Sequence, residues 1–522
     1  MHTISLARFA LVGGTTALLV CACAVGPDFQ RPEPPKVDGY APNPIAQTTA
    51  SAEVVGGEAQ HFAMGRDIPF AWWTQFESPK LNALVEQAFK ANPTITAAQA
   101  ALRQAQEYTA AQRGFFYPTV SAQYNFERQK LPGNVATTNA PGLQGNGQVI
   151  APSAPAEPLV YNFQTAQLTV GYTPDVFGAN RRQVESLQAQ ADTLRYEMEA
   201  TYITLAGNVV AAAIQEASLR AQIEATQRFI DQNAKALDIL HEQFRLGYVM
   251  RLDVAAQESA LAQAREQLPP LLKQLELTHD LVRALVGELP NANIDTTFEF
   301  SSLKLPTDLP VTLPSKLVDQ RPDVRAAEEQ LHSASAQVGV AVAARLPQFT
   351  INGAVGGTAN QASWMFRNGG PFWNLIGDVT QPLFDGFTLM HRQRAAEQGL
   401  LQAQAQYRST VITAFQNVAD TLHAIESDAD SLAACKEAER AAKVMMDVTE
   451  RQYKMGYVNF LILLAAQEAY QQSLITLVQA QSNRYGDTAA LFQALGGGWW
   501  NRTEFSEKQT SASPARGEAR AD

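Results

Sequence analysis

The chain has 522 residues, of which 17% are charged, and its formal charge is −11 at pH 7. This acidic balance argues against nucleic acid as a partner. After residue 22 no stretch has the about 18 uninterrupted apolar residues of a transmembrane helix, so strands must form any part that crosses a membrane.

The amino terminus, residues 1–22, is predicted to be a lipoprotein signal peptide. Arg8 precedes an apolar run from Phe9 to Val20 that is too short to span a bilayer. Ala22 provides the small residue that lipoprotein processing requires before a lipidated cysteine, so Cys23 is the expected lipid attachment site and mature amino terminus. The alternative is an ordinary signal peptide with chance cysteines.

Residues 23–79 are predicted to form an extended arm, because the stretch from Gly26 to Pro44 is rich in proline and lacks periodicity. Pro93 then opens a helix. Proline is accepted in the first helical turn, and apolar residues follow it at helical spacing, at Ile95, Ala98 and Leu102.

Two strand hairpins are predicted, one in each half of the chain. In the first, residues 120–126 and 166–172 alternate apolar with polar side chains on either side of a loop, 131–157, rich in Gly, Pro, Asn and Ala. In the second, residues 349–355 and 375–379 repeat the pattern. A period of two is typical of strands with one apolar and one polar face.

Very long helices follow each hairpin. Residues 181–245 contain no proline and one glycine, which predicts a continuous helix of about 100 Å at roughly 1.5 Å per residue. Gly247 breaks it, and a return helix is predicted over 252–285. The second half repeats this arrangement over 389–453, with a break at Gly456 and a return helix through Leu495. Pro269 and Pro270 are expected to kink or interrupt the first return helix.

The two halves look duplicated. Pro93 recurs as Pro322 and Pro118 as Pro347, both 229 positions later, whereas Gly247-Tyr248-Val249 recurs as Gly456-Tyr457-Val458, 209 positions later. The offset changes in the strand hairpin, whose loop is longer in the first half. We therefore predict a first repeat over 80–290 and a second over 291–500, each a strand hairpin plus a long helical hairpin, with a disordered tail over 501–522.

Four strands of lipid-spanning length cannot close into a barrel. Because all backbone groups in lipid must be paired, several copies would have to pool their strands. Two copies give a barrel of eight strands, and side chains fill the interior of a barrel of that size. Three copies give twelve strands and leave a lumen. The alternation alone leaves open a soluble antiparallel sheet packed on the helices.

The chain resembles a known family, the outer-membrane channel lipoproteins of tripartite efflux systems, TolC-like and more closely OprM-like. The resemblance covers nearly the whole mature chain, and it rests on the order and spacing of several strings: residues 23–29, Trp72-Trp73 with Phe76, residues 321–324 with Ala327-Glu328, residues 382–386, residues 414–420 and residues 494–499.

The resemblance implies an α+β membrane protein that assembles as a homotrimer. Its twelve-stranded β-barrel, four strands per chain, would lie in the outer membrane and continue into a long periplasmic α-helical barrel. It implies a passive exit channel for drugs or toxic compounds, lipid-anchored to the cell outer membrane and extending into the periplasm. The implied partners are a periplasmic adaptor, an inner-membrane pump of the RND type and outer-membrane lipid.

The resemblance also places the gate at the periplasmic tip. Leu461 matches the apolar constriction of the family, and Asp253 lies near the same level, although it equally suits a solvated position opening the return helix. Similar channels often carry acidic rings where this chain has Val458 and Ala465, so an acidic lock is not expected. The tip turns, Gly247-Tyr248 and Gly456-Tyr457, are the expected docking site of the adaptor.

The sequence gives no sign of an enzyme, a cofactor or a metal site. It lacks a phosphate-binding loop, a nucleophile elbow and any closely spaced His or Cys ligand set. Asp428 and Asp430 are interpreted as a solvated helix face. If Cys23 is acylated, Cys435 is the only remaining thiol, so no intrachain disulfide is expected. The alternative function is a lipid-anchored periplasmic coiled-coil scaffold or adaptor that does not span the membrane.

Overall fold

The structure is a computed structural model that describes residues 24–42, 46–131, 159–294, 297–367 and 369–502. The predicted signal peptide, Cys23 and the tail from residue 503 onward lie outside the described residues. The chain divides into two compact units, which are described separately. The first contains the residues up to Gln30 with 105–190 and 331–402, and the second contains 31–104, 191–330 and the residues from Ala403 onward.

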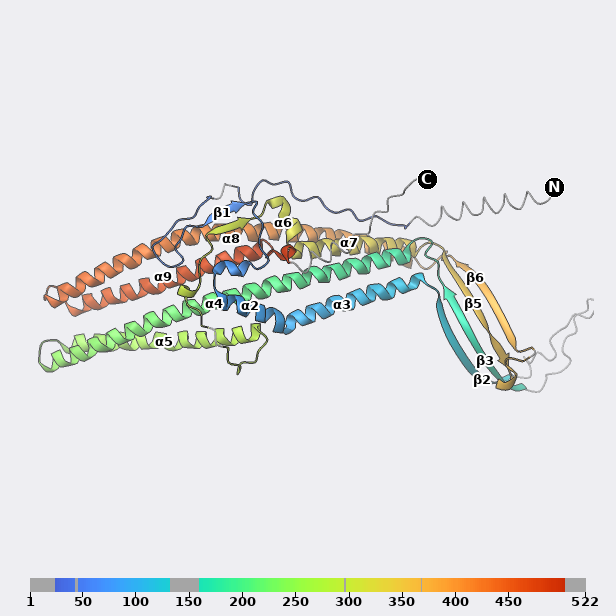
Figure 1. The fold of residues 1–522 in the computed structure, drawn as a ribbon, viewed down its shortest axis with the longest axis horizontal. Coiled ribbons are helices and arrows are strands. Elements are labelled where there is room, and N and C mark those ends of the chain that lie inside the picture. Colours follow the sequence, from blue (N-terminus) through green and yellow to red (C-terminus); the bar gives the residue numbers. More distant parts are fainter. Residues whose placement is uncertain (1–23, 43–45, 132–158, 295–296, 368, 503–522) are drawn as a thin grey trace, which may run out of the picture. The chain divides into compact units, whose positions relative to one another are not determined.

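The first unit contains a four-stranded antiparallel sheet (Figure 1). Its strands are β2 (Thr119–Leu131), β3 (Leu159–Tyr172), β5 (Gln348–Ala359) and β6 (Pro371–Thr380), in the spatial order β2-β3-β5-β6. Both hairpins expected from the alternation are present. They join into one sheet because β3 of the first hairpin pairs with β5 of the second. β2 and β6 are the edge strands, and within the described chain nothing pairs with their outer edges.

The register of this sheet separates apolar from polar side chains. Val120 pairs with Val170, Leu168 with Val355, and Val355 with Trp373. Directly paired residues point to the same side of a sheet. One face therefore carries apolar side chains on all four strands, with Arg128 and Lys130 on it at the far end of β2. Its exposed large apolar side chains are Val120, Tyr124, Phe126, Val160, Leu168, Val170, Ile351, Val355, Trp373, Leu375 and Val379.

The opposite face of the sheet is mostly polar, with Phe163, Phe372 and Ile376 among the exceptions. The Ser121 and Thr169 hydroxyls are 2.6 Å apart, and Gln167 Nε2 donates to Gln123 Oε1 at 3.2 Å. These side chains satisfy one another across the strands while remaining in contact with water.

All four strands connect to helices at the same end of the sheet. α3 (Pro93–Arg113) and a short 3-10 helix, η2 (Gly114–Phe116), lead into β2, and β3 leads into α4 (Ala179–Arg245). In the second hairpin α7 (Pro322–Ala343) leads into β5, the 3-10 helix η5 (Ala362–Trp364) precedes β6, and β6 leads into α8 (Thr388–Lys454).

The long helical hairpins match the predicted bounds to within two residues. α4 and α8 have 67 residues each, and their return helices α5 (Arg251–Leu285) and α9 (Phe460–Ala494) have 35 each. Within the second unit α5 lies beside α4 and α9 beside α8 (Figure 1). The equal lengths reproduce the 209-residue offset read from the sequence.

The first return helix is not interrupted at its two prolines. α5 continues through Pro269 and Pro270. Proline removes an N–H donor and so frees a carbonyl in the preceding turn. The flanking residues Arg265, Glu266 and Lys273 are exposed, so water can bond the freed carbonyls. The expected interruption is therefore wrong.

The carboxyl ends of both return helices are capped by side chains at equivalent positions. Asn92 Nδ2 donates to the Leu285 carbonyl oxygen at 2.8 Å, and Arg321 Nη1 donates to the Ala494 carbonyl oxygen at 2.8 Å. Each donor directly precedes the proline that opens α3 or α7. At the ends of α5 and α9, a carbonyl that has no partner within its own helix is thus bonded by the residue that precedes α3 or α7.

The second unit also has a small aromatic core beside its helices. Trp72 stacks on Phe492 with ring centroids 5.3 Å apart, and Tyr485 contacts both Phe76 and Phe300. The remaining elements are the parallel strands β1 (His61–Met64) and β4 (Asp308–Val311), the helices α2 (Pro79–Ala91) and α6 (Pro314–Gln320), and the 3-10 helices η1 (Trp72–Phe76), η4 (Phe300–Ser302) and η6 (Trp499–Asn501).

A buried arginine ties the amino-terminal arm to α9 in this unit. Arg484 is fully buried, and its Nη2 donates to the Glu58 carbonyl at 2.6 Å and to Thr49 Oγ1 at 3.2 Å. Among the described residues, no helix is long and apolar enough to cross a membrane.

Candidate functional site

The helical hairpins reverse at two turns of the same construction. At the first, Tyr248 N–H donates to the Gln243 carbonyl at 2.9 Å, and Gly247 adopts a left-handed conformation with φ of 80°. At the second, Tyr457 N–H donates to the Gln452 carbonyl at 2.9 Å, and Gly456 has φ of 79°. This backbone pattern ends a helix and requires a residue without a side-chain penalty at positive φ, which explains both glycines.

The return helices start with different caps. In the first hairpin the Asp253 carboxylate accepts from the Met250 N–H at 3.1 Å, three residues before it. In the second, Asn459 Oδ1 accepts from the Ile462 N–H at 3.1 Å. The structure thus gives Asp253 a capping role at the opening of α5.

An apolar cluster joins the two turns. Leu240 and Val254 from the first hairpin pack with Phe460 and Leu464 from the second. Tyr453 lies beside this cluster with its ring edge-to-face to Phe460 at 5.8 Å, and burial together with the charge of Asp253 raises the pKa of Tyr453. The two turns therefore form one packed tip.

Other apolar side chains of the tip face outward. Leu461 is 41% exposed, next to the packed Phe460 and Leu464 on α9, while Tyr248 and Tyr457 are 79% and 77% exposed. Met250, Leu252, Met455 and Ile462 are exposed as well. Exposed apolar groups gathered at one end of a protein are typical of a surface that contacts other chains.

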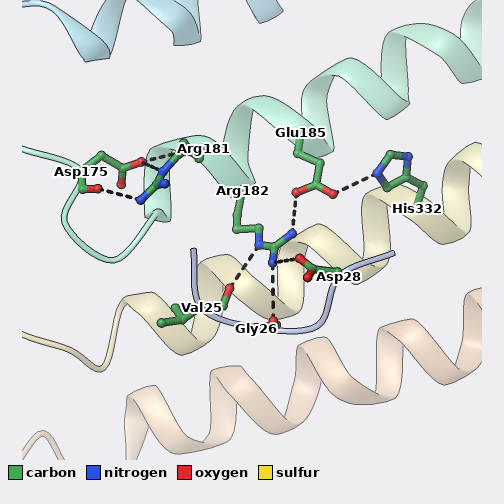
Figure 2. Close-up of polar contacts among 8 residues, drawn as sticks. All are labelled: Val25, Gly26, Asp28, Asp175, Arg181, Arg182, Glu185 and His332. Atoms are coloured by element: carbon green, nitrogen blue, oxygen red, sulfur yellow. Dashed lines mark hydrogen bonds and ion pairs between the residues drawn. The ribbon is translucent and has the colours of Figure 1, made fainter. Parts of the chain in front are cut away.

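A second site, which sequence reasoning missed, holds residues 25–28 in the first unit (Figure 2). Arg182, at the start of α4, has a side chain only 5% exposed. Its Nε donates to the Val25 carbonyl at 3.1 Å, and its Nη2 donates to Asp28 Oδ1 at 2.6 Å. Glu185 accepts from Arg182 Nη1 at 2.8 Å and also contacts the His332 ring at 3.0 Å.

Close backbone contacts complete this Arg182 site. Val25 N–H donates to the Phe177 carbonyl at 3.1 Å. A Cβ on Gly26 would lie 2.4 Å from the Gly339 Cα, and one on Gly178 would lie 2.7 Å from the Ala24 Cα, so larger residues would displace the arm. Burial alone would lower the pKa of Arg182, but the bonds to Asp28 and Glu185 raise it, so the cation is retained.

The acidic residues Asp428 and Asp430 differ in their surroundings. Asp430 is exposed, as expected for a solvated face. Asp428 instead faces Asp487 of α9, and its Oδ2 atom is buried without a hydrogen-bond partner among the described residues. The described residues contain no cluster of three His, Cys, Asp or Glu side chains that could hold a metal ion.

Comparisons with known proteins agree on one family. The profile described as "Outer membrane efflux protein" matches residues 84–288 and 313–497. The chain is 28% identical over 459 residues to the pyoverdine export outer membrane protein OpmQ of Pseudomonas putida, covering 87% of this chain and 94% of that protein. It is 24% identical over 506 residues to the toluene efflux pump outer membrane protein TtgC of P. putida, covering 96% and 98%.

Solved structures show the same fold. The outer-membrane channel OprN superposes with a TM-score of 0.78 at 22% identity over 91% of this chain and all of that chain. The Campylobacter jejuni CmeC channel gives 0.77 at 19% identity over 94% and 98%. With the profile matching well over half of its residues, this chain belongs to the outer membrane efflux protein family.

Proposed function

We propose that three copies of this chain form the exit channel of a tripartite efflux system, a passive conduit from the periplasm or cytoplasm to the exterior. The family consists of outer-membrane efflux proteins, which are conduits rather than enzymes and reach into the periplasm. Membership is at odds with the alternative of a periplasmic scaffold that does not span the membrane.

The observation that carries the proposal is the two-faced sheet with unpaired edges. Its exposed apolar face suits lipid, and its polar face suits a water-filled lumen. An open edge is not tolerated in lipid, because each unpaired backbone group costs several kcal/mol there. Three sheets of four strands would close as twelve and leave a lumen.

The two halves support a duplicated architecture. Helices of 67 and 35 residues occur in both, and the same family profile matches each half. We assign the first repeat to residues 80–290 and the second to 291–500, after an arm over 23–79. The four long helices of each copy would build the wall of a periplasmic α-helical barrel.

We assign the resting gate to the tip. Leu461 is one of the exposed apolar side chains of the tip, and three copies whose Leu461 side chains face a common axis would present an apolar ring. Val458 and Ala465 are uncharged, so the level of Leu461 lacks the acidic residues of an electrostatic lock. The Asp253 carboxylate caps α5, so its negative charge would stay near the start of that helix. The turns at Gly247-Tyr248 and Gly456-Tyr457 would meet a periplasmic adaptor and splay as it docks.

The proposed partners follow from this position. An adaptor would contact the exposed tyrosines of the turns, and an inner-membrane pump would supply the energy that a passive conduit lacks. The named relatives are called a pyoverdine export protein in one case and a toluene efflux pump protein in another, and we propose that the pump sets which substrate this channel carries. Acylation of Cys23, directly before the residues held by Arg182, would anchor the chain in the outer membrane.

The gate is tested by replacing Leu461 with a smaller polar residue. Leu461→Ser should raise the resting conductance of the purified protein in planar bilayers, because it removes the apolar ring. Leu252→Ser is the matched control, since Leu252 occupies the equivalent position of the first hairpin and is 60% exposed.

The mass of the detergent-extracted protein, measured by light scattering, tests the assembly itself. A trimer with conductance raised only in Leu461→Ser supports the proposal. A trimer with equal conductance in both variants would move the gate elsewhere, and a monomer would overturn the channel.

A further inference from the structure

The charged side chains of the sheet are divided by sign between its two faces. The charged residues of the four strands are Glu127, Arg128, Lys130 and Asp378. By the register of the strands, Glu127 and Asp378 lie on the polar face. Arg128 and Lys130 lie on the opposite face, which carries the exposed apolar side chains. This division suits two faces that meet surroundings of different charge.

The two cations share one corner of their face, at the end of the sheet away from the helices (Figure 1). Arg128 pairs with Asn162 across β2 and β3, and Lys130 pairs with Val160. Both cations are exposed, and neither forms an ion pair with a carboxylate among the described residues. Because the neighbouring Glu127 points to the other face, this corner offers positive charge and N–H donors without an opposing acid.

The corner lies where an apolar face of this length would leave the hydrocarbon of a bilayer. Arg128 and Lys130 lie about 27 and 34 Å along the strand from Val120, at roughly 3.4 Å per residue. A strand tilt of about 40° converts these lengths to about 21 and 26 Å across the bilayer, and the apolar band of such barrels is about 25 Å tall.

Aromatic side chains mark the same level. Tyr124 and Phe126 directly precede the corner on the same face and are 62% and 57% exposed. Aromatic residues gather where the hydrocarbon meets the headgroups. A cation facing lipid is costly at the midplane of a bilayer and is tolerated at its surface. Arg128 and Lys130 are therefore expected at the level of the headgroups.

We propose that Arg128, Lys130 and Asn162 bind the anionic phosphate headgroups of lipids in the outer leaflet. This site rests on the proposed function, because only a sheet that spans the outer membrane with its apolar face toward lipid brings the corner to those headgroups. The guanidinium, ammonium and amide groups complement phosphate oxygens. The apolar side chains of the same face contact the acyl chains, so a lipid gains contacts that a free anion lacks.

The experiment uses the full chain, extracted in an uncharged maltoside detergent and titrated with phosphatidylglycerol or with phosphatidylcholine of the same acyl chains. Native mass spectrometry counts the lipids bound. The wild type should bind phosphatidylglycerol more tightly than phosphatidylcholine. Arg128→Gln combined with Lys130→Gln should weaken the binding of phosphatidylglycerol by about 10-fold or more and leave that of phosphatidylcholine unchanged.

Glu127→Gln is the matched control, because it removes a charge at the same level of β2 on the opposite face. It should keep the preference for phosphatidylglycerol. A loss in this control equal to that of the double variant would overturn the site, and so would a double variant that keeps the preference.

Two further measurements separate the remaining outcomes. Displacement of bound phosphatidylglycerol by inorganic phosphate would assign the corner to a free anion and overturn the lipid site. Light scattering on the same samples reports the assembly. A wild-type trimer that binds both lipids equally would overturn the lipid site and leave the channel intact, whereas a protein that is monomeric by mass would overturn both.

Discussion

At the scale of single residues, the acid pair Asp428 and Asp487 joins α8 to α9. Burial raises the pKa of Asp428 to about 7, and the hydrogen bond and charge of Asp487 act in the same direction, while the nearby Arg484 cation opposes them. Arg484 also lies near the Glu58 carboxylate and the Tyr485 hydroxyl. The pair is therefore expected to hold one proton in mildly acidic solution.

This proton makes stability depend on pH. The folded state binds the proton up to about pH 7, whereas an unfolded aspartate releases it near pH 4, so the folded chain holds more protons between these values. The stabilising contribution is complete below about pH 4 and is lost as the pH rises through 7. Asp428→Asn keeps a hydrogen bond to Asp487 without the like charge. The stability of this variant should therefore fall less than that of the wild type as the pH rises.

The measurement is the thermal midpoint of the wild-type protein and of Asp428→Asn between pH 5 and pH 8. Asp430→Asn, at an exposed site of the same helix, serves as the control and should follow the wild type. Parallel curves for Asp428→Asn and the wild type would rule out a shared proton.

The residues that sequence reasoning missed are those whose partners lie far away in the chain. Arg182 bonds to Asp28, 154 positions earlier, and Arg484 bonds to the arm about 430 positions away. Neither residue stands out locally, because Arg182 belongs to a polar helix start and Arg484 to a mainly polar stretch of α9, residues 481–487. The tip glycines were predicted correctly, because a helix that reverses needs a left-handed residue at that point.

At the scale of elements, the absence of proline over 181–245 predicted the first long helix and the repeat predicted the second, while alternation with a period of two predicted the four strands of the sheet. β1 and β4 have four residues each and were missed, since so short a strand has no measurable alternation. The prolines of α5 do not interrupt the helix. The residues around them are exposed, so water can bond the freed carbonyls, although the sequence alone does not show which positions face water.

The turn of the second hairpin gives a prediction about helix termination. Gly456→Ala places a side chain at φ of 79° and should destabilise the chain by about 1–2 kcal/mol. Gly399→Ala is the control. Gly399 lies inside α8, where an added methyl group would meet nothing within 4 Å beyond the backbone of its own helix, so alanine should stabilise there by about 0.5–1 kcal/mol.

Urea denaturation of the detergent-solubilised protein would show both changes. Opposite signs for the two substitutions are expected, and the same sign for both would contradict the left-handed turn.

At the scale of the whole molecule, the two faces of the sheet should respond differently to charge. Leu168 lies on the apolar face and its neighbour Thr169 on the polar face. Leu168→Arg should cost about 2–4 kcal/mol per chain if that face meets the bilayer midplane, whereas Thr169→Arg should be tolerated in a lumen.

The amount of trimer recovered from outer-membrane fractions distinguishes the two variants. We expect less trimer for Leu168→Arg and an unchanged amount for Thr169→Arg. Equal recovery of both, or loss of Thr169→Arg alone, would show that the sheet is not oriented with its apolar face toward lipid.

The equal lengths of the paired helices restrict how a gene for such a protein can change. Both turns contribute to one packed tip, through Leu240 and Val254 on one side and Phe460 and Leu464 on the other. Each residue removed from one hairpin draws its turn back by about 1.5 Å and leaves the partner turn without its contacts. Codons must therefore be gained or lost in matching numbers in both halves, so that the reach of the protein into the periplasm evolves in paired steps.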